Sequence, residues 1–210
     1  MANPVTFLLR AALKKQLVIE NIELLPTHGP FIIAGNHQGF LDAPILSYVV
    51  QKHTGQTPLF PTTSWVWKRY KKMLGARGAQ SLGMLPVLDD KPGAVLEACV
   101  QQLKQGGVIG IFPEGKRNAE VQLRTGKTGA ARLALSSGAP IVPAGIFAGP
   151  GGATDALKEV LQKTPLRIRL GAPIHFTASM ENITREELHR LTDECMRAIA
   201  ALSAKEYQRQ

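Results

Sequence analysis

Short apolar runs alternate with helical patterns along most of this chain, and this alternation limits the fold more than any other feature. The apolar runs cover residues 18–25, 31–35, 57–61, 83–88, 107–112, 141–147 and 166–170. The stretches of helical periodicity cover residues 44–53, 64–74, 92–105, 126–138, 153–163 and 184–204. Alternation of this kind predicts an α/β fold with a central mixed, largely parallel sheet flanked by helices.

One domain accommodates all 210 residues, because a chain of this length buries a substantial core. We expect a short amphipathic helix within residues 1–16 and the α/β core within residues 17–210. No run approaches the roughly 20 consecutive apolar residues of a transmembrane helix, and the first residues do not resemble a secretory signal. Cys99 and Cys195 show no metal or redox spacing, which predicts reduced thiols in a cytosolic protein.

The positive charge of the chain is concentrated in two stretches. The formal net charge is +9, and no acidic residue lies between Asp42 and Asp89. That interval holds the basic residues Lys52, Lys68, Arg69, Lys71, Lys72 and Arg77. Residues 115–154 set Lys116, Arg117, Arg124, Lys127 and Arg132 against Glu120. Such a balance favours an anionic partner: nucleic acid, an anionic membrane surface or a phosphorylated small molecule.

His37 and Asp42 follow the apolar run at 31–35, at the end of a strand where an α/β sheet places its ligand crevice. Histidine accepts a proton near neutral pH, and a carboxylate on its other ring nitrogen fixes the tautomer. Gly39 permits a turn between the two residues, so their side chains can meet. Two interpretations stay open at this point: a catalytic base with its orienting carboxylate, or a helix N-cap beside a loop histidine.

A second polar segment, from Glu114 to Asn118, follows the apolar run at 107–112. Its carboxylate suits a polyol hydroxyl, while Lys116 and Arg117 suit a phosphate. A solvated loop with charges of both signs explains the same residues.

The sequence does not contain the other catalytic motifs that we considered. Residues 126–128 resemble the tail of a phosphate-binding P-loop, but Val121 stands where that motif needs its first glycine. The chain has no Gly-x-Ser-x-Gly nucleophile motif, and its histidines show no metal-ligand spacing. We therefore expect neither a metal nor a resident cofactor.

Taken together and in order, three motifs resemble those of the glycerolipid acyltransferase family, in particular the bacterial 1-acylglycerol-phosphate acyltransferases. The motifs are Asn36-His37-x-x-x-x-Asp42, the run from Phe112 to Arg117 (Phe-Pro-Glu-Gly-Lys-Arg), and Ile141-Val142-Pro143, with Gly126 before the last. The resemblance covers residues 18–172, which is most of the chain.

This resemblance implies direct acyl transfer in phospholipid biosynthesis. The donor would be acyl-CoA or acyl–acyl carrier protein, and the acceptor the hydroxyl of a lysoglycerolipid such as 1-acylglycerol-3-phosphate. His37 would be the general base and Asp42 would orient it. The family's acceptor-binding role would fall on Asn36, Glu114, Gly115, Lys116 and Arg117. A thioester is already activated, so the reaction needs no acyl-enzyme intermediate, metal or cofactor.

One departure from the family pattern concerns the acceptor. The family places an arginine for acceptor phosphate where this chain has Asp89, and an acid is a poor phosphate ligand. Either a neighbouring cation (Lys91, Arg77 or Lys116) takes that role, or the acceptor is a different amphiphile, such as an ornithine lipid or a glycolipid. Lys116 stands where many members have threonine, which adds one cation.

Both tryptophans of the chain lie beside cations. Trp and Tyr favour the headgroup zone of a bilayer, and Lys and Arg are attracted to anionic lipid. We expect a peripheral, monotopic contact with the cytoplasmic face of a membrane, made by Trp65, Trp67, Lys68, Arg69, Lys71 and Lys72. The alternative is that Trp65 belongs to the core and the cations form a solvated face.

The remaining rival is a non-catalytic peripheral membrane-binding protein. Nucleic-acid binding is excluded, because aromatic residues make up only 6% of the chain and no nucleic-acid module is recognisable.

Overall fold

The computed structural model describes residues 11, 14, 17–86, 92–147, 166–178 and 180–209. The helix expected at 153–163 lies outside these residues, and so does the N-terminal helix expected at 3–16, except for positions 11 and 14. Asp89 and Lys91 lie outside them as well.

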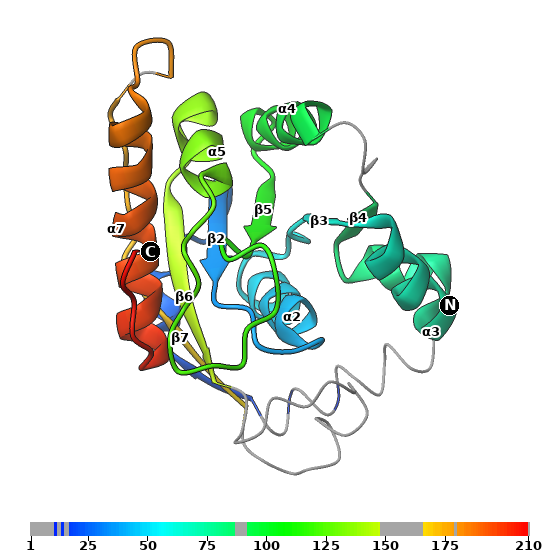
Figure 1. Cartoon of the computed structure of the whole chain (residues 1–210). Coiled ribbons are helices and arrows are strands. Elements are labelled where there is room, and N and C mark those ends of the chain that lie inside the picture. The colour runs from blue at the N-terminus through cyan, green and yellow to red at the C-terminus, as the bar shows by residue number, and fades with distance from the viewer. Residues whose placement is uncertain are drawn as a thin grey trace.

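A five-stranded sheet forms the centre of the molecule, in the order β1-β7-β6-β2-β5. Its strands are β1 (Leu17–Glu20), β2 (Phe31–Gly35), β5 (Val108–Ile111), β6 (Ile141–Phe147) and β7 (Leu166–Leu170). All neighbouring pairs are parallel except β6 with β7, which is antiparallel. This confirms the predicted central mixed, largely parallel sheet (Figure 1).

A small parallel pair extends the structure beside β5. It consists of β3 (Phe60–Thr62) and β4 (Met84–Pro86). Leu59 joins it to the main sheet, because its N–H donates to Val108 and its carbonyl accepts from Gly110, both at 2.9 Å. The pair therefore lies next to β5, at that edge of the main sheet.

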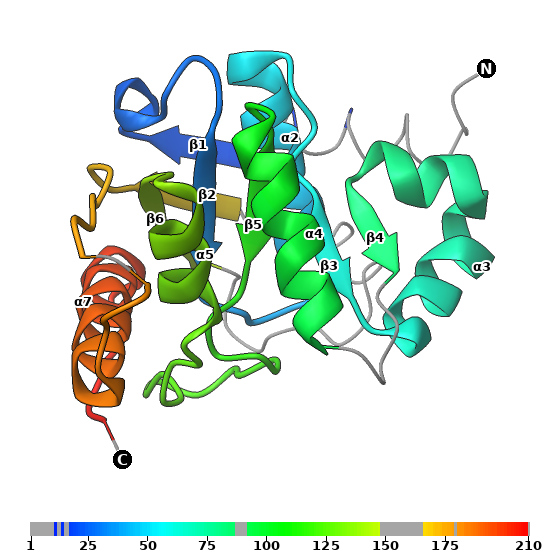
Figure 2. The same cartoon turned by 90° about the horizontal axis from the view of Figure 1, so that it is seen from above.

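Helices cover both faces of the sheet (Figure 1, Figure 2). They are α2 (Asp42–Thr54), α3 (Ser64–Ser81), α4 (Pro92–Lys104), α5 (Gly129–Ser137) and α7 (Arg185–Ser203), with a short 3-10 turn, η1 (Ile22–Leu24). Phe31 and Ile33 of β2 pack in one apolar cluster with α2 and α3, whereas Ile32 and Ala34 pack in another with α4, α5 and α7. Successive side chains of a strand point to opposite faces, so the two helical layers lie on opposite sides of β2.

Helix α3 is longer than its sequence pattern predicts. The periodicity ends at Leu74, but the helix continues to Ser81 across a break at Gly75, where φ is 71° and ψ is 167°. Glycine adopts positive φ without steric penalty, so the chain changes direction there without ending the element. The kink explains why the apolar repeat loses phase at this point.

Three other expectations concern the start of α7, the two cysteines and membrane-spanning helices. The side chain of Thr184 accepts a hydrogen bond from the N–H of Glu187 at 3.1 Å, as the predicted start of α7 requires. Cys99 and Cys195 are buried and unpaired. Within the described residues, no helix is both long enough and apolar enough to cross a bilayer.

Candidate active site

The turn between β2 and α2 brings His37 and Asp42 together. His37 Nδ1 lies 2.7 Å from Asp42 Oδ2, and the same oxygen accepts the N–H groups of Gln38 at 2.6 Å and Gly39 at 2.8 Å. The N-cap position of α2 is Leu41, so the Asp42 carboxylate bonds backbone that precedes the helix rather than capping its first turn. The chain thus holds this carboxylate in place from three directions.

This geometry defines what the imidazole can do. Asp42 is only 2% exposed while the His37 side chain is 23% exposed, so the pair has a buried end and an open end. A carboxylate at Nδ1 favours the tautomer with its proton on Nδ1, which leaves the Nε2 lone pair to accept a proton. The ring stacks on Phe112 at a centroid distance of 4.2 Å and an interplanar angle of 13°. The aromatic contact and the hydrogen bond together fix the orientation of the ring.

Glu114 lies behind His37 rather than in an open binding site. It is 3% exposed, and its Oε1 accepts the backbone N–H of His37 at 3.0 Å. Its Oε2 accepts from Asn118 Nδ2 at 2.8 Å and from the N–H of Arg124 at 3.1 Å. The N–H of Asn118 donates in turn to the carbonyl of His37 at 2.6 Å. The geometry therefore favours a positioning role for Glu114 over the direct acceptor contact expected from the sequence.

Asn36 is likewise engaged within the chain. Its side-chain amide donates to the carbonyl of Ile146 at 3.0 Å and accepts the N–H of Ile146 at 2.7 Å. The residue is 1% exposed and joins the end of β2 to β6. A substrate contact would require these bonds to break, so here too the geometry favours positioning over the expected binding role.

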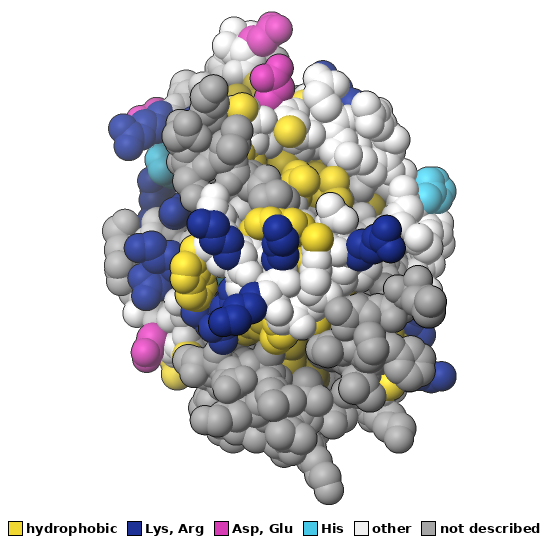
Figure 3. All heavy atoms as spheres, turned by 90° about the vertical axis from the view of Figure 1, so that its right-hand side faces the viewer, with side chains coloured by type: hydrophobic (Ala, Val, Ile, Leu, Met, Phe, Trp, Pro, Cys, Tyr) yellow, Lys and Arg dark blue, Asp and Glu magenta, His cyan; other side chains and the backbone are white. Residues whose placement is uncertain are grey.

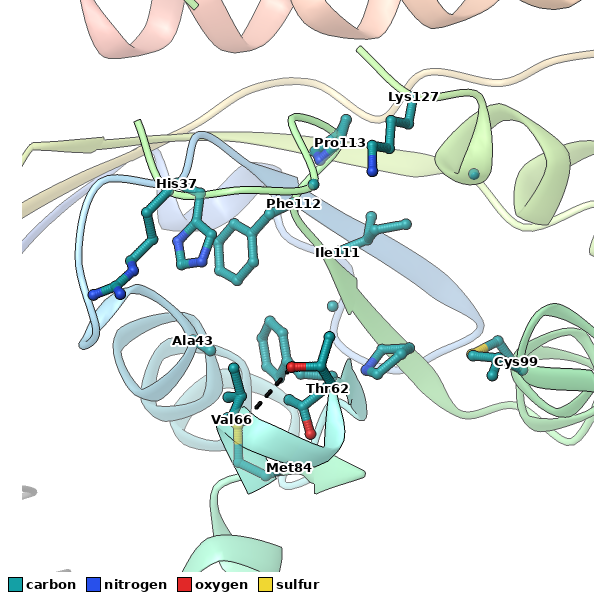
Figure 4. A pocket seen from close by; sticks show the side chains of 18 of the residues that line it. His37, Ala43, Thr62, Val66, Met84, Cys99, Ile111, Phe112, Pro113 and Lys127 are labelled. Atoms are coloured by element: carbon teal, nitrogen blue, oxygen red, sulfur yellow. Dashed lines mark hydrogen bonds between the residues drawn. The ribbon is translucent and has the colours of Figure 1, made fainter. Parts of the chain in front are cut away.

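A cavity of about 380 Å³ opens beside His37. Its lining includes the polar residues His37, Arg117 and Lys127, which we call the polar rim. Its inner walls are mostly apolar and come from β3, β4, β5, α4 and α5, among them Phe60, Met84, Leu96, Cys99, Ile111 and Leu133. Figure 4 shows the imidazole of His37 against Phe112 at one side, with Cys99 of α4 at the other. An apolar cavity with a few polar groups at one end suits a ligand with a hydrocarbon chain and a polar head.

Lys127 is the site residue that sequence reasoning missed. Its N–H donates to the carbonyl of Pro113 at 2.8 Å, which draws the two ends of the loop at residues 112–128 together. Its side chain crosses Gly115, where an added Cβ would lie 2.7 Å from Lys127 Cε. Gly115 has a φ of 70°, so both backbone geometry and space favour glycine there. The local excess of cations in the sequence was the signal that could have found this lysine.

The other residues predicted to bind the acceptor differ in whether they line the cavity. Arg117 and Gly115 line it, whereas Lys116 is exposed on the same loop. Arg77 is exposed on α3.

Helix α3 presents a basic face to the outside, made of Trp65, Lys68, Arg69, Lys71 and Lys72. Trp65 is 61% exposed and the four cations are exposed, which makes a core position for Trp65 wrong. Trp67 is half-buried and packs against the apolar core. Figure 3 shows this side of the molecule, where Lys and Arg side chains surround exposed hydrophobic ones. Trp65 also lines the cavity, so the basic face and the cavity mouth are continuous.

Comparisons with known proteins identify the family of the chain. The family model described as Acyltransferase matches residues 16–147, more than half of the chain. A 1-acyl-sn-glycerol-3-phosphate acyltransferase of Bacillus subtilis (strain 168) is 29% identical over 201 residues, covering 92% of each chain. A chloroplastic 1-acyl-sn-glycerol-3-phosphate acyltransferase of Arabidopsis thaliana is 28% identical over 166 residues, covering 75% of this chain and 43% of the plant protein.

A solved structure shows the same fold. The crystal structure of the 1-acyl-sn-glycerophosphate (LPA) acyltransferase PlsC from Thermotoga maritima matches with a TM-score of 0.65 and 21% sequence identity. The match covers 97% of this chain and 82% of that one. The arrangement of sheet and helices is therefore common to both proteins.

Proposed function

The chain belongs to the acyltransferase family, and on this premise we propose that it moves a fatty acyl group from an acyl thioester to the hydroxyl of a lysoglycerolipid. The proposed acceptor is 1-acylglycerol-3-phosphate, in keeping with the names of the relatives. The observation that carries the proposal is the His37–Asp42 pair at the mouth of an apolar cavity rimmed by Arg117 and Lys127.

His37 acts as general base in this proposal. Nε2 takes the proton of the acceptor hydroxyl while its oxygen attacks the thioester carbonyl carbon. A C–O bond forms, the C–S bond breaks, and the leaving thiolate receives the proton from the imidazolium. Asp42 keeps the proton on Nδ1 and stabilises the imidazolium that forms transiently. No metal or resident cofactor takes part, and the donor is acyl-CoA or acyl–acyl carrier protein.

The two substrates divide the cavity between them. The acyl chain lies along the apolar walls, because burial of hydrocarbon stabilises the complex by about 0.8 kcal/mol per methylene. Arg117 and Lys127 attract the acceptor phosphate at the rim, and the arginine suits bidentate binding. These cations supply the positive charge that the family pattern places at the position of Asp89.

The acceptor lives in a bilayer, so the proposal includes peripheral contact with a membrane through the basic face of α3. Each cation near an anionic surface contributes about 1 kcal/mol, and an interfacial tryptophan adds an anchor. Because Trp65 borders the cavity as well as the exposed face, a docked bilayer places its lipids next to the cavity mouth.

A thiol-release assay tests the chemistry. The purified protein is incubated with long-chain acyl-CoA and a panel of acceptors, with and without a phosphate group, beside His37→Ala. His175→Ala is the matched control, because His175 is exposed and lies outside the cavity lining. Acceptor-dependent release that is lost in His37→Ala and kept in His175→Ala supports the proposal. No turnover with any acceptor, or equal turnover in His37→Ala, refutes it, and turnover with unphosphorylated acceptors alone favours the ornithine-lipid or glycolipid alternative.

A further inference from the structure

The loop at residues 112–128 carries most of the polar rim but forms no helix or extended strand of its own. It connects the end of β5 to the start of α5, and it carries Arg117 and Lys127 of the rim as well as the buried Glu114. Long connections of this kind adopt one conformation only when other parts of the chain bind them. The contacts of Glu114 and Asn118 hold its first part, next to His37. The part that follows is held by a different element.

That element is the C-terminal segment at residues 205–207, which follows α7. The N–H of Glu206 donates to the carbonyl of Val121 at 3.1 Å, and the N–H of Leu123 donates to the carbonyl of Glu206 at 2.8 Å. Gln122 and Glu206 thereby form a parallel bridge of the kind seen between strands. Lys205 Nζ donates to the carbonyl of Glu120. After α7 the end of the chain turns back along the helix, on the side where this loop lies (Figure 1).

The C-terminal segment is itself fastened to α7. Tyr207 donates its hydroxyl to Asp193 Oδ1 at 2.7 Å, and its ring packs against the apolar cluster beneath α7. Burial, followed by the hydrogen bond to Asp193, raises the pKa of Tyr207 to about 12, so this donor stays protonated at neutral pH. Gly126 packs directly on α7, where an added Cβ would lie 2.5 Å from Met196 Cγ. Loop, segment and helix form one connected unit.

We propose that the C-terminal segment Lys205–Tyr207 is a positioning element of the active site: it holds residues 120–123 so that Arg117 and Lys127 face the cavity. The catalytic consequence rests on the proposed function, whereas the ordering of the loop does not.

Protection of the loop from protease tests the ordering without any substrate. Glu206→Pro removes the N–H that bonds Val121, and Glu206→Ala is its matched control because it keeps that N–H. Trypsin can cut the loop at its exposed cations, Lys116, Arg117, Arg124 and Lys127. We expect cleavage in the loop to be about tenfold faster in Glu206→Pro, because cleavage follows the population of the opened loop. Far-UV circular dichroism checks that both variants keep the fold, and equal cleavage rates in the two folded variants overturn the proposal.

Kinetics test the link to catalysis. If the segment positions the rim, Glu206→Pro raises the KM of the phosphorylated acceptor several-fold more than that of acyl-CoA, since the apolar walls come largely from other elements. A general loss of folded enzyme lowers kcat and leaves both KM values unchanged, so this split separates positioning from simple destabilisation. Equal changes in both KM values refute the positioning role.

If the unsubstituted protein shows no acyl transfer at all, the proposed function fails, while the protease experiment still decides whether the segment orders the loop.

Discussion

Asp42→Asn is the substitution that most directly tests the assigned chemistry. The amide oxygen of asparagine can still accept the N–H groups of Gln38 and Gly39, which now bond Asp42 Oδ2 at 2.6 and 2.8 Å. The same oxygen faces His37 Nδ1, so it still accepts the Nδ1 proton, and the amide NH₂ takes the place of Asp42 Oδ1. The neutral amide, however, does not stabilise the positive charge that the imidazolium acquires when Nε2 takes the proton.

The expected loss in rate is large. A hydrogen bond to a charged partner is worth up to about 3 kcal/mol, and each 1.4 kcal/mol corresponds to about tenfold in rate. We therefore expect kcat of Asp42→Asn to fall by about 10². Because Asp42 and His37 act as one unit, the double variant with His37→Ala should be no slower than His37→Ala alone.

The effect on stability should be small by comparison. The two backbone hydrogen bonds survive but lose their charge assistance, which amounts to about 1–2 kcal/mol. For a chain of this size that corresponds to a decrease in Tm of roughly 2–8 °C, so the variant stays folded at assay temperature.

Initial rates of thiol release and thermal unfolding measure both quantities on the same samples. Glu194→Gln is the control, because it removes an exposed carboxylate of α7 that pairs weakly with Arg190. A kcat of Asp42→Asn within tenfold of the unsubstituted enzyme refutes the reasoning, and so does a double variant whose two effects add.

Three further predictions follow from the rim, the cavity and α3. Arg117→Ala and Lys127→Ala should each raise the KM of a phosphorylated acceptor about tenfold and leave that of an unphosphorylated one unchanged; equal effects on both acceptors in steady-state assays would contradict a phosphate contact. Burial raises the pKa of the Cys99 thiol to about 11, so at pH 8 only about 0.1% is thiolate; alkylation by iodoacetamide, followed by mass spectrometry, should therefore be slow at pH 8 and accelerate as pH rises towards 11. Fast alkylation of Cys99 at pH 7 would contradict this. Replacing Lys68, Arg69, Lys71 and Lys72 by glutamine should weaken binding to anionic vesicles by about 100-fold or more, whereas replacing the exposed cations Lys104, Arg132, Arg185 and Arg197 should have a much smaller effect in the same sedimentation assay. Equal losses for the two sets would mean that vesicle binding depends on the net charge of the protein and not on the basic face of α3.

Local patterns predicted the elements well because short-range physics sets them. Alternating apolar runs and helical repeats located the strands and helices of the described residues, and the pattern failed mainly where a single glycine breaks α3. The His37–Asp42 pair was also predictable, since a turn of a few residues constrains both side chains.

Roles that depend on long-range contacts were not predictable. Asn36 and Glu114 follow strands and were predicted to bind the acceptor, Asn36 from the family resemblance alone. Their long-range partners are Ile146 for Asn36 and His37 for Glu114, and only the folded structure shows that both side chains make hydrogen bonds within the chain. The opposite error concerns Lys127 and Lys205. Neither belongs to a sequence motif that predicts a role, yet Lys127 lines the cavity and Lys205 bonds the loop beside it.

The sequence by itself determined the α/β alternation, the chemistry available after each strand and the uneven distribution of charge. These follow from the order of residues and from interactions within a few positions. The tertiary structure decided which polar groups line the cavity and which are buried and hydrogen-bonded to the backbone around it. It also decided that Trp65 borders both the cavity and the basic face of α3. The physical reason is that burial and hydrogen-bond partners depend on segments far apart in the chain, such as residues 120–123 and 205–207, whose meeting no local pattern encodes.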